Sequence, residues 1–161
     1  MSRALIAYCD GAIETRALKS LGGEPRKLPA WGFVLYELPA DNPALEVLVK
    51  HWGLCDVRGP VSNNVAEYQA VKECLAWVVD HEPRDLFGLT LTVRGDSRLW
   101  VEQLSGRTSV RGGAYEDVAA VARTLRDLLR GRGARVRFEW VPRAENAEAD
   151  HLSRMPYRES V

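Results

Sequence analysis

Four acidic residues stand at positions where their carboxylates could meet. Asp10 directly follows an alternating apolar segment, and Asp96 follows a second segment of the same kind. Glu67 lies four and seven residues before apolar positions of a predicted helix, so helical spacing places it on the apolar stripe rather than on the solvated face. Asp150 belongs to the last predicted helix. This pattern predicts a cluster of partly buried carboxylates.

Carboxylates that are crowded together repel one another, which raises their pKa values. A bound cation relieves that repulsion, and hard oxygen ligands without accompanying thiolates favour Mg²⁺ or Mn²⁺. Two such ions about 4 Å apart can activate a water molecule and stabilise the leaving oxygen in phosphodiester hydrolysis. Each acid alone also fits a simpler interpretation, with Asp96 as a helix cap and Asp10 in a turn. Glu67 is harder to explain in this way, because an unpaired buried acid is costly.

The elements that would position these acids alternate between strands and helices. Apolar residues at a spacing of two predict strands, and spacings of three and four predict helices. The expected strands are 3–9, 31–38, 45–54, 89–93 and 135–141. The expected helices are 64–80, 96–104, 115–130 and 147–154, separated by loops at 14–30 and 105–113 and followed by a loose tail after Pro156.

This order, βββαβααβα, predicts an α/β fold with a mixed five-stranded sheet flanked by helices. The first three strands form an antiparallel meander, because the turns between them are too short for a crossover helix. A right-handed crossover makes the 89–93 strand parallel to the first, so Asp10 and Asp96 lie at one edge of the sheet. We expect one domain over 1–155 and a C-terminal tail over 156–161.

Composition narrows the possible classes of protein. The 161 residues carry 22 basic and 22 acidic side chains, a balance that argues against strong, purely electrostatic binding of nucleic acid. Three widely spaced cysteines argue against a disulfide framework and against a zinc knuckle. No apolar run could span a bilayer and the first residues do not form a signal peptide, so we expect no membrane partner and a cytoplasmic location.

Four local motifs resemble those of the ribonuclease H type 1 family, in the family's own order. The segment 8–12 is similar to its first-strand motif, which ends in Asp-Gly-Ser/Ala, and 62–68 is similar to Thr-Asn-Asn-x-x-Glu. The segment 94–97 resembles the strand that ends in Asp-Ser, and 140–150 resembles Val-x-Arg-x-x-Asn-x-x-Ala-Asp. Each motif is weak to moderate alone, but their conjunction across positions 8–152 is specific.

The resemblance implies a ribonuclease H-like fold and a two-metal hydrolase that cuts the RNA strand of RNA–DNA hybrids, leaving 3′-hydroxyl and 5′-phosphate ends. Its two ions would be Mg²⁺, with Mn²⁺ as an alternative, and its catalytic and metal-binding acids would be Asp10, Glu67, Asp96 and Asp150. Amide side chains both donate and accept hydrogen bonds, which suits a 2′-hydroxyl and a base edge. The expected substrate-binding residues are Gly11, Asn63, Asn64, Ser97, Arg98, Arg107, Arg111 and Asn146.

Three departures from the family pattern accompany this resemblance. The loop 141–145 lacks the histidine of many members, and Arg143 is the nearest substitute, with an electrostatic role because arginine cannot accept a proton. The loop 105–113 is too short for the family's basic protrusion, although Arg107 and Arg111 remain. The insert 14–30 replaces a short turn, and it is either a solvated loop or a nucleic-acid contact made by Arg16, Lys19, Arg26 and Lys27.

Two other functions stay open at this point: a non-catalytic nucleic-acid-binding or interaction module, and a different nuclease of the same superfold. A complete set of four acids argues against the first, and the Asn-Asn-x-x-Glu start of the helix argues against the second. The five tryptophans are expected to pack in the core, with Trp100 also able to line the substrate groove because it follows Asp96 by one helical turn. We expect the domain to be monomeric.

Overall fold

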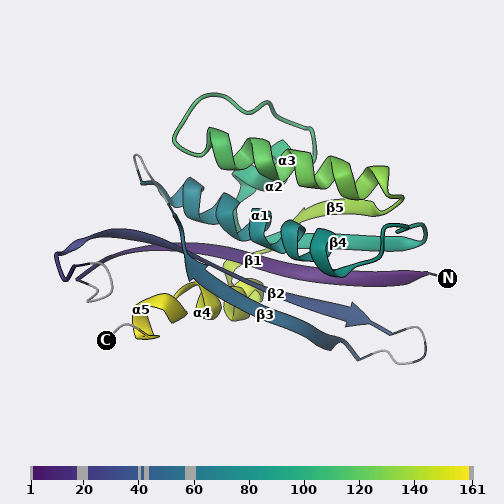
Figure 1. Ribbon diagram of the computed structural model, residues 1–161, viewed down its shortest axis with the longest axis horizontal. Helices are drawn as coiled ribbons and strands as arrows, with labels where there is room; N and C mark the ends of the chain where they lie inside the picture. The colour runs from purple at the N-terminus through teal and green to yellow at the C-terminus, as the bar shows by residue number, and fades with distance from the viewer. Residues whose placement is uncertain (1, 18–21, 40, 42–43, 57–60, 160–161) are drawn as a thin grey trace.

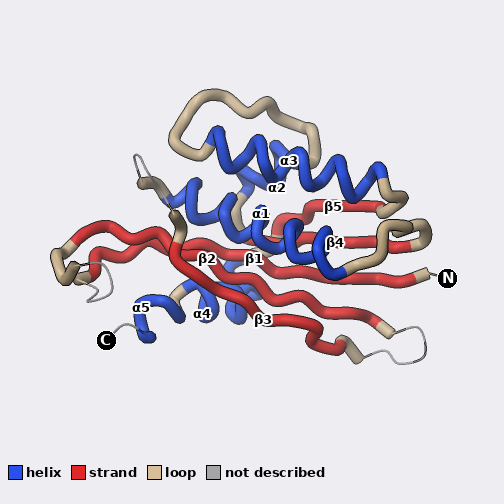
Figure 2. Tube along the Cα trace, in the orientation of Figure 1, coloured by secondary structure: helices blue, strands red, loops and turns tan. Residues whose placement is uncertain are grey.

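The computed structural model describes residues 2–17, 22–39, 41, 44–56 and 61–159. Its described strands form one mixed five-stranded sheet in the order β3-β2-β1-β4-β5 (Figures 1 and 2). β1 pairs antiparallel with β2, which pairs antiparallel with β3, whereas β1, β4 and β5 run parallel. The strand bounds are β1 Arg3–Arg16, β2 Arg26–Leu38, β3 Glu46–Leu54, β4 Leu89–Gly95 and β5 Arg135–Trp140. The predicted meander and the predicted parallel pairing are confirmed.

The helices cover both faces of this sheet. α1, α2 and α3 lie on one face, and α4 and α5 lie on the other (Figures 1 and 2). Their bounds are α1 Asn63–His81, α2 Arg98–Leu104, α3 Glu116–Gly131, a 3-10 turn η2 Arg143–Asn146, α4 Ala147–Ser153 and α5 Met155–Glu159. The predicted α/β class and element order are confirmed, with α5 added at the end. No helix among the described residues is both long and apolar enough to cross a membrane.

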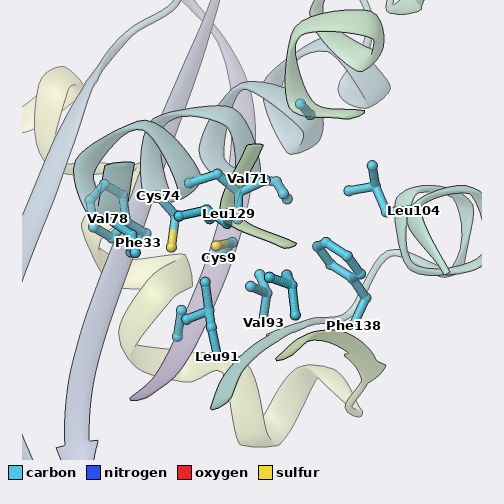
Figure 3. Close-up of a cluster of buried hydrophobic side chains, with 14 of the residues drawn as sticks. Cys9, Phe33, Val71, Cys74, Val78, Leu91, Val93, Leu104, Leu129 and Phe138 are labelled. Carbon is cyan, nitrogen blue, oxygen red and sulfur yellow. The ribbon is translucent and has the colours of Figure 1, made fainter. Parts of the chain in front are cut away.

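The main core lies between α1 and the sheet. Figure 3 shows Cys74 of α1 beside Cys9 of β1, with Leu91 and Val93 of β4 close by. All four side chains are fully buried, because helical and strand periodicities point both apolar faces into the same layer. The three cysteines are free thiols, as their odd number and wide spacing predict.

The segment 14–30, predicted as a loop, is mostly a β-hairpin. β1 does not end at Asp10 but continues to Arg16, and β2 already begins at Arg26, so the two strands extend past α1 (Figure 1). The backbone ladder continues through the pairs Thr15↔Lys27 and Arg16↔Arg26, which satisfies the peptide groups that a loop would leave to water. Lys19 lies outside the described residues.

The expectation of a loose tail after Pro156 is wrong for residues 156–159, which belong to α5. Tyr157 is only 2% exposed, and its hydroxyl donates to the backbone carbonyls of Ala12 and Leu28. These carbonyls belong to the two strands of the hairpin. The last helix therefore closes a second, smaller core against the β1–β2 extension.

Candidate active site

Three of the four predicted acids converge at one edge of the sheet. Asp10 of β1, Glu67 of α1 and Asp96 after β4 each offer a carboxylate oxygen, and these oxygens all lie within 4.8 Å of one another. The parallel register of β1 and β4 explains why Asp10 and Asp96 lie close together. Tyr8 pairs with Arg94, so Asp10 and Asp96 each lie two residues beyond the same rung of the ladder.

Gly11 explains how α1 brings Glu67 to this edge. A Cβ at Gly11 would lie 2.3 Å from the carbonyl carbon of Ala66 and 2.4 Å from the amide nitrogen of Glu67. Only glycine allows the helix backbone to approach the strand so closely. The backbone N–H of Gly11 also donates to the Glu67 carboxylate. The structure thus gives Gly11 a packing role, and the expected contact of Gly11 with substrate stays a prediction.

The cluster perturbs the acid–base properties of its members. Burial raises the pKa of Asp10 to about 10, and the negative charges of Glu67 and then Asp96 add to the effect. Burial also raises the pKa of Glu67 to about 8, with a further increase from the charge of Asp96 and a partial decrease from its hydrogen bonds. A hydrogen bond between Asp10 and Glu67 raises the pKa of Asp10 and lowers that of Glu67.

These residues fit a hard divalent cation. The Oε2 atom of Glu67 is buried and has no hydrogen-bond partner among the described residues. A buried carboxylate oxygen in that state is costly unless a positive charge faces it. The group contains carboxylates only, with no thiolate or imidazole, which favours Mg²⁺ or Mn²⁺ over zinc.

Asp150 borders this group through Asp10. It lies on α4, outside the 4.8 Å group, and its hydrogen bond to Asp10 is one of the causes that raise the pKa of Asp10. Its Oδ1 lies 3.4 Å from Nε of Arg154, whose Nη1 lies 3.0 Å from Oε1 of Glu14 on the hairpin. Arg154 therefore links the fourth acid to the β1–β2 extension. The spacing of four residues between Asp150 and Arg154 is the sequence signal that could have revealed this pair.

Asn146 holds α4 in place, and its predicted contact with substrate stays a prediction. Its side chain is 1% exposed, and its Nδ2 donates to the backbone carbonyl of Cys9 over 2.9 Å. Because Cys9 precedes Asp10, this bond ties the start of α4 to the strand that carries the first acid. The buried amide therefore fixes the start of α4 against the strand that carries Asp10, and it does not face solvent.

The other predicted polar contacts lie at the starts of two helices beside the cluster. Asn63 is exposed and Asn64 half-buried in the first turn of α1, and Ser62 caps that helix by accepting a hydrogen bond from the N–H of Val65 over 3.3 Å. Ser97, not Asp96, is the N-cap residue of α2, and its side chain makes no capping hydrogen bond. The Asp96 carboxylate is therefore not used as a helix cap and belongs to the acid cluster. The predicted substrate contacts of Asn63, Asn64 and Ser97 stay predictions.

The predicted arginines are all exposed. Arg98 stacks on Trp140, with its guanidinium carbon 4.0 Å from the ring centre. Nη1 of Arg107 lies 3.5 Å from Glu102. The backbone carbonyl of Arg111 accepts a hydrogen bond from the Tyr115 hydroxyl over 3.3 Å. Within the described part of the chain no ion pair joins Arg143 to the acids, so its electrostatic role stays a prediction.

Of the two tryptophans Trp100 and Trp140, Trp100 lies in the core as expected, whereas Trp140 does not. Trp100, proposed as a possible groove residue, is fully buried, and its ring makes an edge contact with Phe138 at a centroid distance of 6.3 Å. Trp140, expected in the core, is 39% exposed. Its position at the end of the edge strand β5 explains this difference, because alternation along a strand does not reveal whether a helix covers its last residue.

Comparison with protein families and curated proteins agrees with this site. Residues 49–156, more than half of the chain, match the family described as reverse transcriptase-like. A curated relative, the bifunctional protein Rv2228c of Mycobacterium tuberculosis, is 37% identical over 95 residues, which is 59% of this chain. The match spans only 24% of that relative's length.

Solved structures show the same fold. The N-terminal ribonuclease H domain of Rv2228c superposes with a TM-score of 0.72 at 27% identity, covering 99% of this chain and 96% of that one. The ribonuclease H1 of the halophilic archaeon Halobacterium salinarum gives 0.69 at 27% identity, covering 97% and 98%. LC11-RNase H1, solved in complex with an RNA/DNA hybrid, gives 0.71 at 24% identity, covering 96% and 97%.

Proposed function

Because this chain belongs to the reverse transcriptase-like family and has the fold of the type 1 ribonucleases H, we propose that it hydrolyses the RNA strand of RNA–DNA hybrids. The observation that carries the proposal is the convergence of Asp10, Glu67 and Asp96, with Asp150 joined to it through Asp10. The products would carry 3′-hydroxyl and 5′-phosphate ends. The hybrid bound to LC11-RNase H1 supports this choice of substrate.

The four acids would hold two Mg²⁺ ions, or Mn²⁺ in their place. When bound, such ions activate the attacking water and stabilise the leaving oxygen of a phosphodiester. The protein's own contribution is positioning. Gly11 lets Glu67 reach the strand, and Asn146 fixes the start of α4 so that Asp150 borders Asp10.

The residues around the acids would select the substrate. Asn63 and Asn64 can donate and accept at once, which suits the 2′-hydroxyl that distinguishes RNA from DNA. Arg143 carries a fixed positive charge on the turn just before α4, where it would attract the phosphate backbone. Arg107 and Arg111 lie in the loop after α2 and would add two further phosphate contacts.

The test compares three labelled substrates of one sequence: an RNA–DNA hybrid, duplex RNA and duplex DNA. We expect internal cleavage of the RNA in the hybrid with Mg²⁺ or Mn²⁺, no cleavage with chelator, and product RNA that a 3′-end polymerase can extend. Asp10→Asn should be inactive, whereas Asp80→Asn, an exposed acid near the end of α1, should match the wild type.

Two outcomes would favour the alternatives. Hybrid binding without cleavage under any metal condition would indicate a non-catalytic module. Equal or faster cleavage of duplex DNA would indicate a different nuclease of this fold. The monomeric state and the cytoplasmic location stay predictions, and light scattering on the purified chain would test the first.

A further inference from the structure

A cavity of about 800 Å³ opens beside the acid cluster, at the ends of β4 and β5. Its walls come from β1, β4, α2, the loop after α2, the end of β5 and the turn η2, and they include Arg94, Arg98, Arg107 and Trp140. The indole Nε1 of Trp140 donates to the backbone carbonyl of Asp96 over 3.1 Å. The cavity is therefore held in a fixed position next to the proposed metal ligands, although their carboxylates do not line it.

The three arginines of this cavity differ in how well they are neutralised. Arg94 is fully engaged, with Nε 3.0 Å from Glu139 and Nη1 2.9 Å from the hydroxyl of Tyr8. Arg107 is loosely paired with Glu102 over 3.5 Å. Arg98 has no carboxylate partner among the described residues, so its charge is available to a ligand.

Trp140 holds that free cation in place. The guanidinium of Arg98 lies over the indole at 4.0 Å from the ring centre, which is the geometry of a cation–π contact. A guanidinium stacked by its face keeps the N–H groups of its edge free, and that edge matches two phosphate oxygens. Of the acids in the cavity wall, Glu102 and Glu139 are paired with arginines, and Glu145 is exposed.

We propose that Arg98 binds one backbone phosphate of the nucleic acid and that Trp140 is the positioning residue for this arginine. The proposal rests on the function proposed above, because it assumes that the scissile phosphate lies at the acid cluster next to Asp96. The phosphate can belong to the RNA strand or to the DNA strand. Both present the same phosphodiester to the same guanidinium, so the experiment must separate them.

The first measurement is binding of a short RNA–DNA hybrid in Ca²⁺ at several salt concentrations. Arg98→Ala should weaken binding about tenfold and reduce the log–log salt slope by about 1, the value for one lost phosphate contact. Arg135→Ala, at the opposite end of β5 and also exposed, is the matched control and should leave both quantities unchanged. Equal weakening by the two variants would overturn the proposal.

The second measurement tests the role of Trp140. Trp140→Leu removes the stack and should weaken binding about threefold, whereas Trp140→Phe keeps an aromatic face and should stay within about twofold of the wild type. Adding Trp140→Leu to Arg98→Ala should cause no further loss, because the tryptophan acts through the arginine. In Mg²⁺ each variant should raise KM and leave kcat unchanged. Additive losses, or a lowered kcat, would refute the positioning role.

The third measurement identifies the strand. A set of hybrids carries one uncharged methylphosphonate linkage each, at successive positions of either the RNA or the DNA strand. At the contacted linkage the wild type and Arg98→Ala should bind equally, and the strand containing it is the ligand. If no linkage removes the difference, Arg98 binds no single phosphate and the proposal is wrong. Binding without cleavage would instead refute the proposed hydrolysis while leaving this subsite standing.

Discussion

Replacing Asp10 with asparagine should stabilise the metal-free protein at neutral pH. Burial beside Glu67 and Asp96 raises the pKa of Asp10 from an ordinary value of 3.8 to about 10. Between these two values the folded protein binds one proton more than the unfolded chain. The stability that this proton supplies is fully present below the unfolded pKa, and it is lost as the pH rises toward the folded pKa.

One extra bound proton changes the free energy of unfolding by about 1.4 kcal/mol per pH unit. The wild type without metal should therefore lose about 2.7 kcal/mol between about pH 5 and pH 7 from this site. Asp10→Asn cannot titrate there, so its slope should be shallower by about 1.4 kcal/mol per pH unit. Asp10 is 4% exposed, which is why solvent does not screen the effect.

The assay is urea unfolding in chelator at several pH values, with Asp80→Asn as the control acid. The same unfolding curves with Mg²⁺ or Mn²⁺ complete the test, because a cation at about 100 times its Kd adds about 2.7 kcal/mol to the state that binds it. The wild type and Asp80→Asn should gain this stability, and Asp10→Asn should not. A wild-type stability that stays flat from about pH 5 to pH 8, or an equal slope in Asp10→Asn, would refute the buried carboxylate cluster.

Three further changes probe the elements around the cluster. Asp96→Asn should keep the fold and lose nearly all cleavage, since Asp96 does not cap α2; near wild-type turnover in Mg²⁺ would exclude it as a ligand. Gly11→Ala should destabilise the protein by about 3 kcal/mol in urea unfolding, because its Cβ would meet the Ala66 backbone, and an unchanged midpoint would contradict that contact. Arg154→Ala should change stability by less than about 1 kcal/mol, since its pairs are partly exposed. It should also tighten Mn²⁺ binding in calorimetry by about fivefold, because it removes the cation that competes for Asp150; equal affinity would show that the pair does not limit the metal site.

Local periodicity was sufficient to predict most of the fold. Alternating apolar residues mark β1 and β4, and the apolar stripe of α1 marks the helix that joins the meander to β4. These patterns act over a few residues, so they can be recognised without knowing any partner. The handedness of the crossover then placed Asp10 and Asp96 at one edge, which the structure confirms.

Contacts between distant residues explain the features that local periodicity did not predict. The hairpin beyond Gly11 contains Gly22, Gly23 and prolines, which locally indicate a loop, yet the pairing of β1 with β2 keeps it in the sheet. Tyr157 is buried because its hydroxyl is hydrogen-bonded to two backbone carbonyls of that hairpin. Asn146 is buried because it reaches the carbonyl of Cys9, a partner 137 positions away.

By itself, the amino-acid sequence determined the order of elements, the parallel pair of strands and the acids that they carry, because side-chain periodicity and chain connectivity are local properties. Only the tertiary structure decided that Gly11 admits the backbone of α1 and that Arg154 links Asp150 to Glu14. It also decided that Trp140 is exposed and that the guanidinium of Arg98 stacks on its ring. Such contacts depend on the distances between elements, and packing sets those distances after the local pattern has chosen the elements.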